Sequence, residues 1–149
     1  MPGILTGLAA LLSAVTGLYI AFQNDQSNER SDHNIIELSV DSFSLDPMPP
    51  TQNKPVVVTA YVRNSGNLDA RNILIKWWPG VKFPDPLSKT IPLIREGEVE
   101  RVVFNYPGYR SWYGQIETKI TVNPNKSIIE QNYDNNTLEK KIPVWKSKD

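Results

Sequence analysis

Apolar and polar residues alternate in short runs between about residue 35 and residue 144 of the chain. Alternation with a period of two is typical of a β-strand that buries one face. Clusters of Pro, Gly and Asn separate the runs, as they do in turns. The pattern predicts an all-β, immunoglobulin-like antiparallel sandwich of about seven strands. The apolar positions that share a face are Ile36, Leu38 and Val40; Val56, Val58, Ala60 and Val62; Ile73, Ile75 and Trp77; Val102, Phe104 and Tyr106; Ile116, Ile120 and Val122; and Leu138 with Ile142.

Breaks in this alternation predict local irregularities. Phe43 has the opposite parity to Val40, which predicts a β-bulge between them. Trp77 is expected in the core and Trp78 on the opposite face of the same strand. Three prolines lie within residues 81–93, so this range is expected to be a loop with at most a short edge strand. Lys140 interrupts the apolar face of the last strand and predicts an edge or a strand end.

Residues 4–22 carry no charged side chain. A helix of this length spans about 28 Å, close to the hydrocarbon thickness of a bilayer. A cleaved signal peptide and a soluble helix are the alternatives. The lack of Lys or Arg before the run and the poor cleavage site favour an uncleaved anchor. We therefore expect a single transmembrane helix in residues 1–22, a polar linker in 23–34, the sandwich in 35–144 and a polar tail in 145–149.

Small residues recur within this span at intervals of three and four, so they share one helix face. Such a stripe lets two helices approach closely in lipid. Membrane spans are also rich in Gly and Ala without any partner helix, so both interpretations stay open. The stripe consists of Gly3, Gly7, Ala10, Ala14, Gly17 and Ala21.

Composition removes several classes of function. Sixteen Lys and Arg balance sixteen Asp and Glu, and this gives no support to nucleic-acid binding. The chain has no cysteine, which excludes disulfides and thiol chemistry. Its single histidine, His33, lies in the polar linker. No catalytic set can be assembled, so we expect a protein that is not an enzyme and has no cofactor.

The polar stretch 123–136 is expected to be the loop before the last strand. Its side-chain oxygens could bind calcium, which takes six to eight such ligands. Asn and Asp also bond to their own backbone in turns, and this is the alternative role. Ile128 and Ile129 are expected to hold the loop against the core. The candidate oxygen ligands are Asn123, Asn125, Glu130, Asp134, Asn135 and Asn136.

Aromatic residues and an arginine crowd another predicted loop. Tyr109, Arg110, Trp112 and Tyr113 are of the types that dominate binding hot spots. They form a candidate recognition surface for a protein, a sugar or a membrane. The alternative is that several of them fold down over the end of the sandwich, as a buried tyrosine does in related folds.

Two segments of the chain resemble the CARDB domain, the cell-adhesion-related domain found in bacteria. The first, residues 58–73, contains the Asn-x-Gly turn formed by Asn64 and Gly66. The second, residues 120–136, is similar to the closing motif of the family. The family often has Asp where this chain has Asn123. The matched positions of the closing motif are Asn123, Glu130, Asp134, Asn135 and Asn136.

The resemblance covers about residues 35–144 and implies an extracytoplasmic interaction or spacer module without catalytic activity. We therefore expect a single-pass membrane protein whose C-terminal domain lies outside the membrane and binds a protein partner or a second copy. A carbohydrate is an alternative ligand. The orientation rests on the all-β body, whose pattern is of a secreted type, because Arg30 is the only basic residue soon after the span and the charge count decides nothing. The competing hypothesis is an accessory subunit that associates through its transmembrane helix and uses the sandwich as a spacer.

Overall fold

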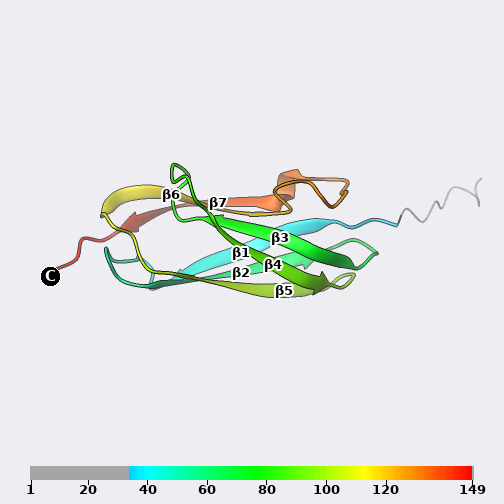
Figure 1. Cartoon of the computed structure of the whole chain (residues 1–149), viewed down its shortest axis with the longest axis horizontal. Helices are drawn as coiled ribbons and strands as arrows, with labels where there is room; N and C mark the ends of the chain where they lie inside the picture. Colours follow the sequence, from blue (N-terminus) through cyan, green and yellow to red (C-terminus); the bar gives the residue numbers. More distant parts are fainter. Residues whose placement is uncertain (1–33, 149) are drawn as a thin grey trace, which may run out of the picture. The chain divides into compact units, whose positions relative to one another are not determined.

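The computed structural model describes residues 34–148, which form strands and one short 3-10 helix, η1 (Figure 1). Alternating apolar residues place one face of each strand in the interior, as the sequence predicts. The elements are β1 (Leu38–Asp46), β2 (Val56–Asn64), β3 (Ala70–Trp78), β4 (Leu87–Ile94), β5 (Val99–Tyr106), β6 (Tyr113–Val122), η1 (Asp134–Asn136) and β7 (Thr137–Val144).

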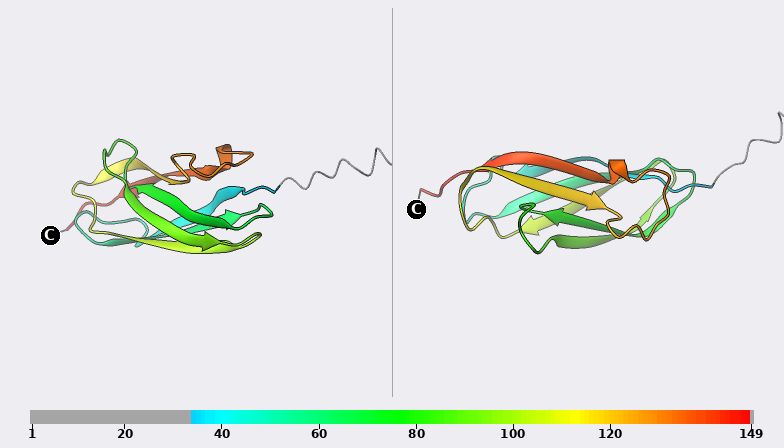
Figure 2. Two further views of the ribbon diagram at one scale, coloured as in Figure 1. Left: turned by 45° about the vertical axis from the view of Figure 1, so that its right-hand side comes forward. Right: turned by 90° about the horizontal axis from the view of Figure 1, so that it is seen from above.

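The seven strands form two antiparallel sheets that lie face to face (Figure 2). One sheet has the order β1-β2-β5 and the other the order β4-β3-β6-β7. The chain changes sheets between β2 and β3, between β4 and β5 and between β5 and β6, which gives the sandwich connectivity of immunoglobulin-like domains. The predicted all-β sandwich is confirmed for the described residues.

The core lies between the two sheets. Trp77 is fully buried and packs against Phe104 and Tyr106, with ring centroids 6.2 Å and 5.3 Å away. Trp78 lies on the outer face of β3, where the amine of Lys119 is 4.7 Å from its ring centroid. The opposite placement of the two tryptophans is confirmed, because successive side chains of a strand point to opposite faces.

The predicted bulge in β1 is also confirmed. The register of β1 on β2 shifts between Val40 and Ser42. Both Val40 and Phe43 are therefore buried, although their parity in the sequence differs. At the far edge, β7 is an edge strand, as Lys140 predicted, and the Lys140 amine donates a hydrogen bond to the carbonyl oxygen of Phe43 in β1.

The prediction of a loop over residues 81–93 was wrong for its second half. Residues Leu87–Ile94 form β4, a full edge strand paired with β3. Ile91 and Ile94 are buried and supply the apolar contacts that hold the strand. Pro92 is tolerated because an edge strand leaves one side of its backbone without a hydrogen-bonded neighbour.

The predicted transmembrane helix, its small-residue stripe and the linker up to residue 33 lie outside the described residues. Within residues 34–148, no helix is both long enough and apolar enough to cross a membrane.

The strands run lengthwise, so the connections gather at two ends of the sandwich (Figures 1 and 2). The proximal end, at which the described chain begins, comprises residues 34–37, 65–69, 95–98 and 123–136. The distal end comprises residues 47–55, 79–86, 107–112 and 145–148, and the chain leaves the domain there. The candidate site residues of the described chain lie in these two ends, except Asn64 and Tyr113, which are the adjoining terminal residues of β2 and β6.

Candidate functional site

The closing loop at the proximal end is built around the buried carboxylate of Glu130. Its Oε2 accepts a hydrogen bond from the backbone N–H of Leu38 at 2.6 Å. Its Oε1 accepts one from Nδ2 of Asn123 at 2.5 Å and one from Nδ2 of Asn136 at 2.8 Å. Glu130 is only 8% exposed, so these donors take the place of water. The carboxylate thereby ties the loop to the start of β1.

The amides of this loop use their nitrogen atoms to hold the two glutamates, whereas the Oδ1 atoms of Asn135 and Asn136 are buried without a hydrogen-bond partner. Asn123 and Asn136 direct their nitrogen atoms, not their oxygen atoms, at Glu130. Asn135 likewise donates from Nδ2 to Oε1 of Glu37, at 3.1 Å. A cation at Glu130 would need oxygen atoms, not these nitrogen atoms, to converge on one point. Among residues 34–148, no three acidic or histidine side chains come together as a metal site.

The two isoleucines of the closing loop, Ile128 and Ile129, differ in burial. Ile128 packs against the core, as predicted. Ile129 is 87% exposed, so the prediction that it also holds the loop was wrong. Asp134 begins η1, where its backbone N–H donates to Oδ1 of Asn132. The loop is thus held by polar contacts to Glu130 and Glu37 more than by its apolar residues.

The Asn-x-Gly turn also has a structural role. Asn64 is fully buried, and its Nδ2 donates to the carbonyl oxygens of Leu68 and Ile94 at 2.7 Å and 3.2 Å. A Cβ on Gly66 would overlap the carbonyl oxygen of Ile35. The turn therefore needs glycine so that the entering chain can pass close to it.

At the distal end, hydrogen bonds join three segments that are distant in sequence. The N–H of Trp145 donates to Pro50 O at 2.9 Å, and the N–H of Gln52 donates to Trp145 O at 2.8 Å. The side chain of Gln52 donates to Arg110 O at 3.0 Å. The N–H of Asn53 donates to Tyr109 O at 2.8 Å. The ordered sandwich therefore extends to Trp145, one residue beyond the predicted boundary.

The structure removes Tyr109 from the predicted recognition surface. The side chain is fully buried, and its hydroxyl donates to Pro79 O at 3.1 Å. Burial raises the pKa of the phenol far above its ordinary value, and the neighbouring Tyr106 and Tyr113 raise it further. The alternative, in which an aromatic residue of this loop covers the end of the sandwich, is correct for Tyr109.

Besides Val81 in the 79–86 segment, three larger apolar side chains are exposed at the distal end. Met48, Trp112 and Trp145 are 54%, 57% and 59% exposed. Arg110 is also exposed, and Tyr113 is half-buried. The sequence interpretation named Trp112 but missed Met48 and Trp145. Met48 and Trp145 lie outside the alternating runs, so periodicity could not have indicated that their side chains are exposed. The only available signal was that turn-forming residues lie next to them.

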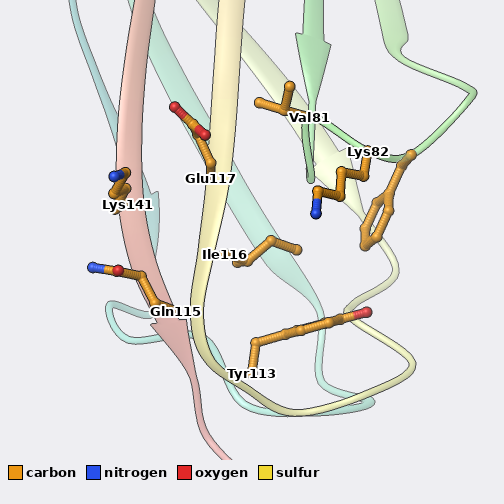
Figure 3. Close-up of a pocket in the computed structure, with 8 residues that line it drawn as sticks. Val81, Lys82, Tyr113, Gln115, Ile116, Glu117 and Lys141 are labelled. Atoms are coloured by element: carbon orange, nitrogen blue, oxygen red, sulfur yellow. The ribbon is translucent and has the colours of Figure 1, made fainter.

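A cavity of about 400 Å³ opens between the 79–86 segment and β6 (Figure 3). Val81, Phe83, Tyr113 and Ile116 give it an apolar lining. The remaining lining residues are polar or charged: Lys82, Gln115, Glu117 and Lys141. The sequence could not reveal this cavity, because its walls come from three different parts of the chain.

The two ends of the domain carry opposite formal charge. The distal segments hold five basic residues and one acidic residue, which gives +4. The proximal segments hold two basic and six acidic residues, which gives −4. The distal residues are Lys54, Lys82, Arg110, Lys146, Lys148 and Asp85; the proximal residues are Arg95, Lys126, Glu37, Asp69, Glu96, Glu98, Glu130 and Asp134.

Two facing antiparallel sheets, the inward Trp77 of β3 and the buried Tyr109 just before β6 define an immunoglobulin-like β-sandwich domain. Within this class of fold, the closing motif points to one family. The family model for CARDB matches residues 35–140, and the chain belongs to the CARDB family.

Solved structures of low sequence identity share the fold. The CARDB domain of the PF1109 protein from Pyrococcus furiosus, solved in complex with di-metal ions, has a TM-score of 0.62 and 16% identity, and the match covers 76% of this chain and 97% of that one. A domain of a candidate cell surface protein from Methanosarcina acetivorans has a TM-score of 0.58 and 22% identity, with 74% and 92% covered. A cycloisomaltooligosaccharide glucanotransferase from Paenibacillus sp. has a TM-score of 0.52 and 16% identity, but only 15% of that chain is covered. No curated protein matches the chain.

Proposed function

We propose that this protein is a membrane-anchored interaction module that displays its CARDB domain outside the cell membrane and binds a protein partner through the distal end. One observation carries the proposal. Met48, Trp112 and Trp145 are exposed on segments that hydrogen bonds fix in place. Exposed apolar side chains on a pre-ordered surface are typical of interaction sites, because binding then orders few additional groups.

The location rests on sequence and family. Residues 4–22 are uncharged and long enough to span a bilayer as a helix. The Methanosarcina acetivorans relative is a candidate cell surface protein, which supports an exposed domain here. The proposed role is non-catalytic. Glu130 and Tyr109 are buried titratable groups, and both make contacts that hold loops.

Site-specific photo-crosslinking in cells tests this function. A photoreactive amino acid is placed at Trp112 or at Trp145, and a matched probe replaces Arg71, whose exposed side chain lies on β3 outside the distal end. We expect protein adducts from the two distal positions and none from position 71. Equal adducts from all three positions, or none from either tryptophan, would contradict the proposal.

The small-residue stripe favours a second function, in which the protein is an accessory subunit that associates through residues 1–22. Gly7 and Ala14 occupy one face of the predicted span. Replacing both by Ile should abolish association in this case and leave the crosslinks at Trp112 unchanged if the distal end binds independently. Retention of the partner by the fragment 34–149 alone would contradict the accessory-subunit function.

A carbohydrate is the alternative ligand for the same surface, since exposed tryptophans can stack on sugar rings. A glycan array probed with the native domain and with Trp112→Ala separates the two classes. Binding to a defined glycan that the substitution abolishes would replace the protein partner by a sugar.

A further inference from the structure

We infer that the distal end selects an acidic protein segment and anchors it by one large apolar side chain, which enters the cavity between the 79–86 segment and β6. The inference rests on the proposed function and names the chemistry of the partner. Its two parts, the apolar anchor and the acidic flanks, follow from separate observations.

The cavity is large enough for such an anchor. Its volume of about 400 Å³ lies within the range of ligand pockets, which is about 300–1,000 Å³. Ile116 lies in the middle of the lining side chains and Tyr113 along one side of them (Figure 3). A side chain of the partner that covers them would remove apolar surface from water, which is the usual source of energy at a binding hot spot.

The walls of the cavity are fixed by the fold. The N–H of Val81 donates to Glu117 O at 2.7 Å, so the 79–86 segment begins by following β6. The N–H of Phe83 donates to Gly80 O at 2.8 Å and turns the chain away. A Cβ at Gly80 would lie 2.8 Å from Cδ1 of Ile116, so the two segments are already in close contact. The cavity lies where the 79–86 segment and β6 diverge.

A series of aromatic contacts connects this wall to the core. The rings of Phe83 and Tyr113 are 6.3 Å apart, and those of Tyr113 and Tyr109 are 6.5 Å apart. Tyr109 contacts Tyr106 at 5.2 Å, which in turn contacts Trp77 at 5.3 Å. The pocket aromatics are therefore held in place before a ligand arrives, which reduces the entropy lost on binding.

The charges around the cavity favour an anionic partner. Lys82 and Lys141 lie on opposite sides of β6 at the rim (Figure 3). Within residues 34–148, neither amine is part of an ion pair. Glu117 also lines the cavity and lies opposite Lys141 in the β6–β7 register, so the rim has a net charge of +1. The distal segments as a whole carry +4, which steers acidic partners toward this end.

A protein segment fits this combination better than an anionic membrane does. A lipid surface would engage the protruding Trp112, Trp145 and the lysines, but it has no side chain to fill a single recess. The partner segment uses both features. Its apolar residue occupies the cavity while its acidic neighbours face Lys82 and Lys141.

The test uses the fragment 34–149, because the core of the domain lies within it and the Pyrococcus furiosus relative is a single such domain. Three peptides are titrated and followed by NMR: Ac-Glu-Glu-Trp-Glu-Glu-NH2, the same peptide with Ala for Trp, and the same peptide with Lys for Glu. We expect saturable shifts of the Ile116 methyl signals with the first peptide. The other two should bind at least tenfold more weakly.

Charge reversal provides the matched variants. Lys82→Glu should weaken binding of the acidic Trp peptide about tenfold, since a nearby attractive charge becomes repulsive. Arg71→Glu, remote from the cavity, should leave the affinity unchanged. Higher salt should weaken binding by the native domain and have less effect on Lys82→Glu.

Three results would overturn the inference: no shift at Ile116 with the acidic Trp peptide, equal binding of the Lys-flanked peptide, or binding only to vesicles of phosphatidylglycerol. The last result would assign the distal end to a lipid surface. In each case the crosslinking at Trp112 and Trp145 still decides separately whether the distal end contacts a protein in cells.

Discussion

Glu130 shows how single residues of this family motif act. Its buried carboxylate receives donors from β1, from the start of the closing loop and from the end of that loop. Hydrogen bonds to a charged group contribute about 1.5–3 kcal/mol each, more than those between neutral groups. One side chain thus holds both ends of a 14-residue loop against the first strand. The role of the motif is therefore to stabilise the folded domain.

Replacing Asn136 by Ala removes one donor of Glu130 and leaves the carboxylate less satisfied. We expect the free energy of unfolding to fall by about 1–3 kcal/mol, as for other buried polar groups that lose a partner. Thermal unfolding followed by circular dichroism measures the effect. Asn125→Ala, at an exposed position of the same loop, is the control and should change stability by less than about 0.5 kcal/mol. Identical melting of the two variants would contradict the structural role.

Because Tyr109 is buried, we expect the folded domain to lose stability at alkaline pH. A tyrosine in the unfolded chain titrates near pH 10, whereas burial raises the pKa of Tyr109 in the folded state above that value. The folded protein therefore retains a proton that the unfolded chain loses. The contribution is fully present below about pH 10 and is lost as the pH rises toward the folded pKa.

Melting temperatures measured between about pH 8 and pH 11 test this prediction. The native domain should lose stability above about pH 10, and Tyr109→Phe should show a smaller loss. The variant should also be less stable at about pH 8, because it lacks the hydrogen bond to Pro79 O. Tyr61→Phe, on an exposed outer face, is the control. A steep alkaline loss that Tyr109→Phe leaves unchanged would assign it to other groups.

Among the elements, β3 and β6 are joined by more than their backbone ladder. The indole N–H of Trp77 donates to the hydroxyl of Thr118 at 2.8 Å. The same hydroxyl donates to Trp78 O at 2.8 Å. The buried hydroxyl therefore satisfies the largest core side chain and the end of its strand together.

Thr118→Val keeps the shape of the side chain but leaves the indole N–H without its acceptor. The free energy of unfolding should fall by about 1–3 kcal/mol. Thr121→Val is the matched control on β6, since its hydroxyl contacts Thr137 at an exposed site. Urea unfolding, followed by tryptophan fluorescence, compares the two variants. A greater loss from Thr121→Val would contradict this account of the β3–β6 contact.

A comparison of the individual strands with the sequence pattern shows which of them could be predicted. Strands that bury one face reveal themselves by alternation, so β2, β3, β5 and β6 were predicted correctly. The edge strand β4 was expected to be a short strand at most, because Pro84, Pro86 and Pro92 obscure the signal from its buried residues, Ile91 and Ile94. Tyr109 and Trp112 lie in one loop, where no periodicity separates a buried aromatic residue from an exposed one. The cavity depends on contacts between distant segments, which local patterns do not encode.

For the whole domain, the two ends divide the roles between them. The acidic proximal end is occupied by structural contacts among Glu130, Asn123 and Asn136. The basic distal end instead leaves Trp112 and Trp145 exposed. Changes that stabilise one end need not alter recognition at the other, because different segments of the chain supply the two sets of side chains.

A single core connects the ends, which predicts that they unfold together. Strands β1, β2 and β3 each run from one end to the other, and their buried residues form one cluster. Small domains with one core usually unfold in a single cooperative transition. Asn136→Ala, at the proximal end, should therefore lower the urea midpoint reported by the Trp145 indole signal at the distal end.

NMR of the fragment 34–149 in urea provides the measurement. The indole signals of Trp77 and Trp145 should disappear at the same urea concentration in the native fragment, and Asn136→Ala should shift both midpoints equally. The slope of the transition should be unchanged, because the same surface is exposed on unfolding. If the Trp145 signal were lost first, or did not respond to Asn136→Ala, the distal segments would unfold separately from the core. Their fixed geometry, on which the preformed cavity depends, would then have to come from the bound partner.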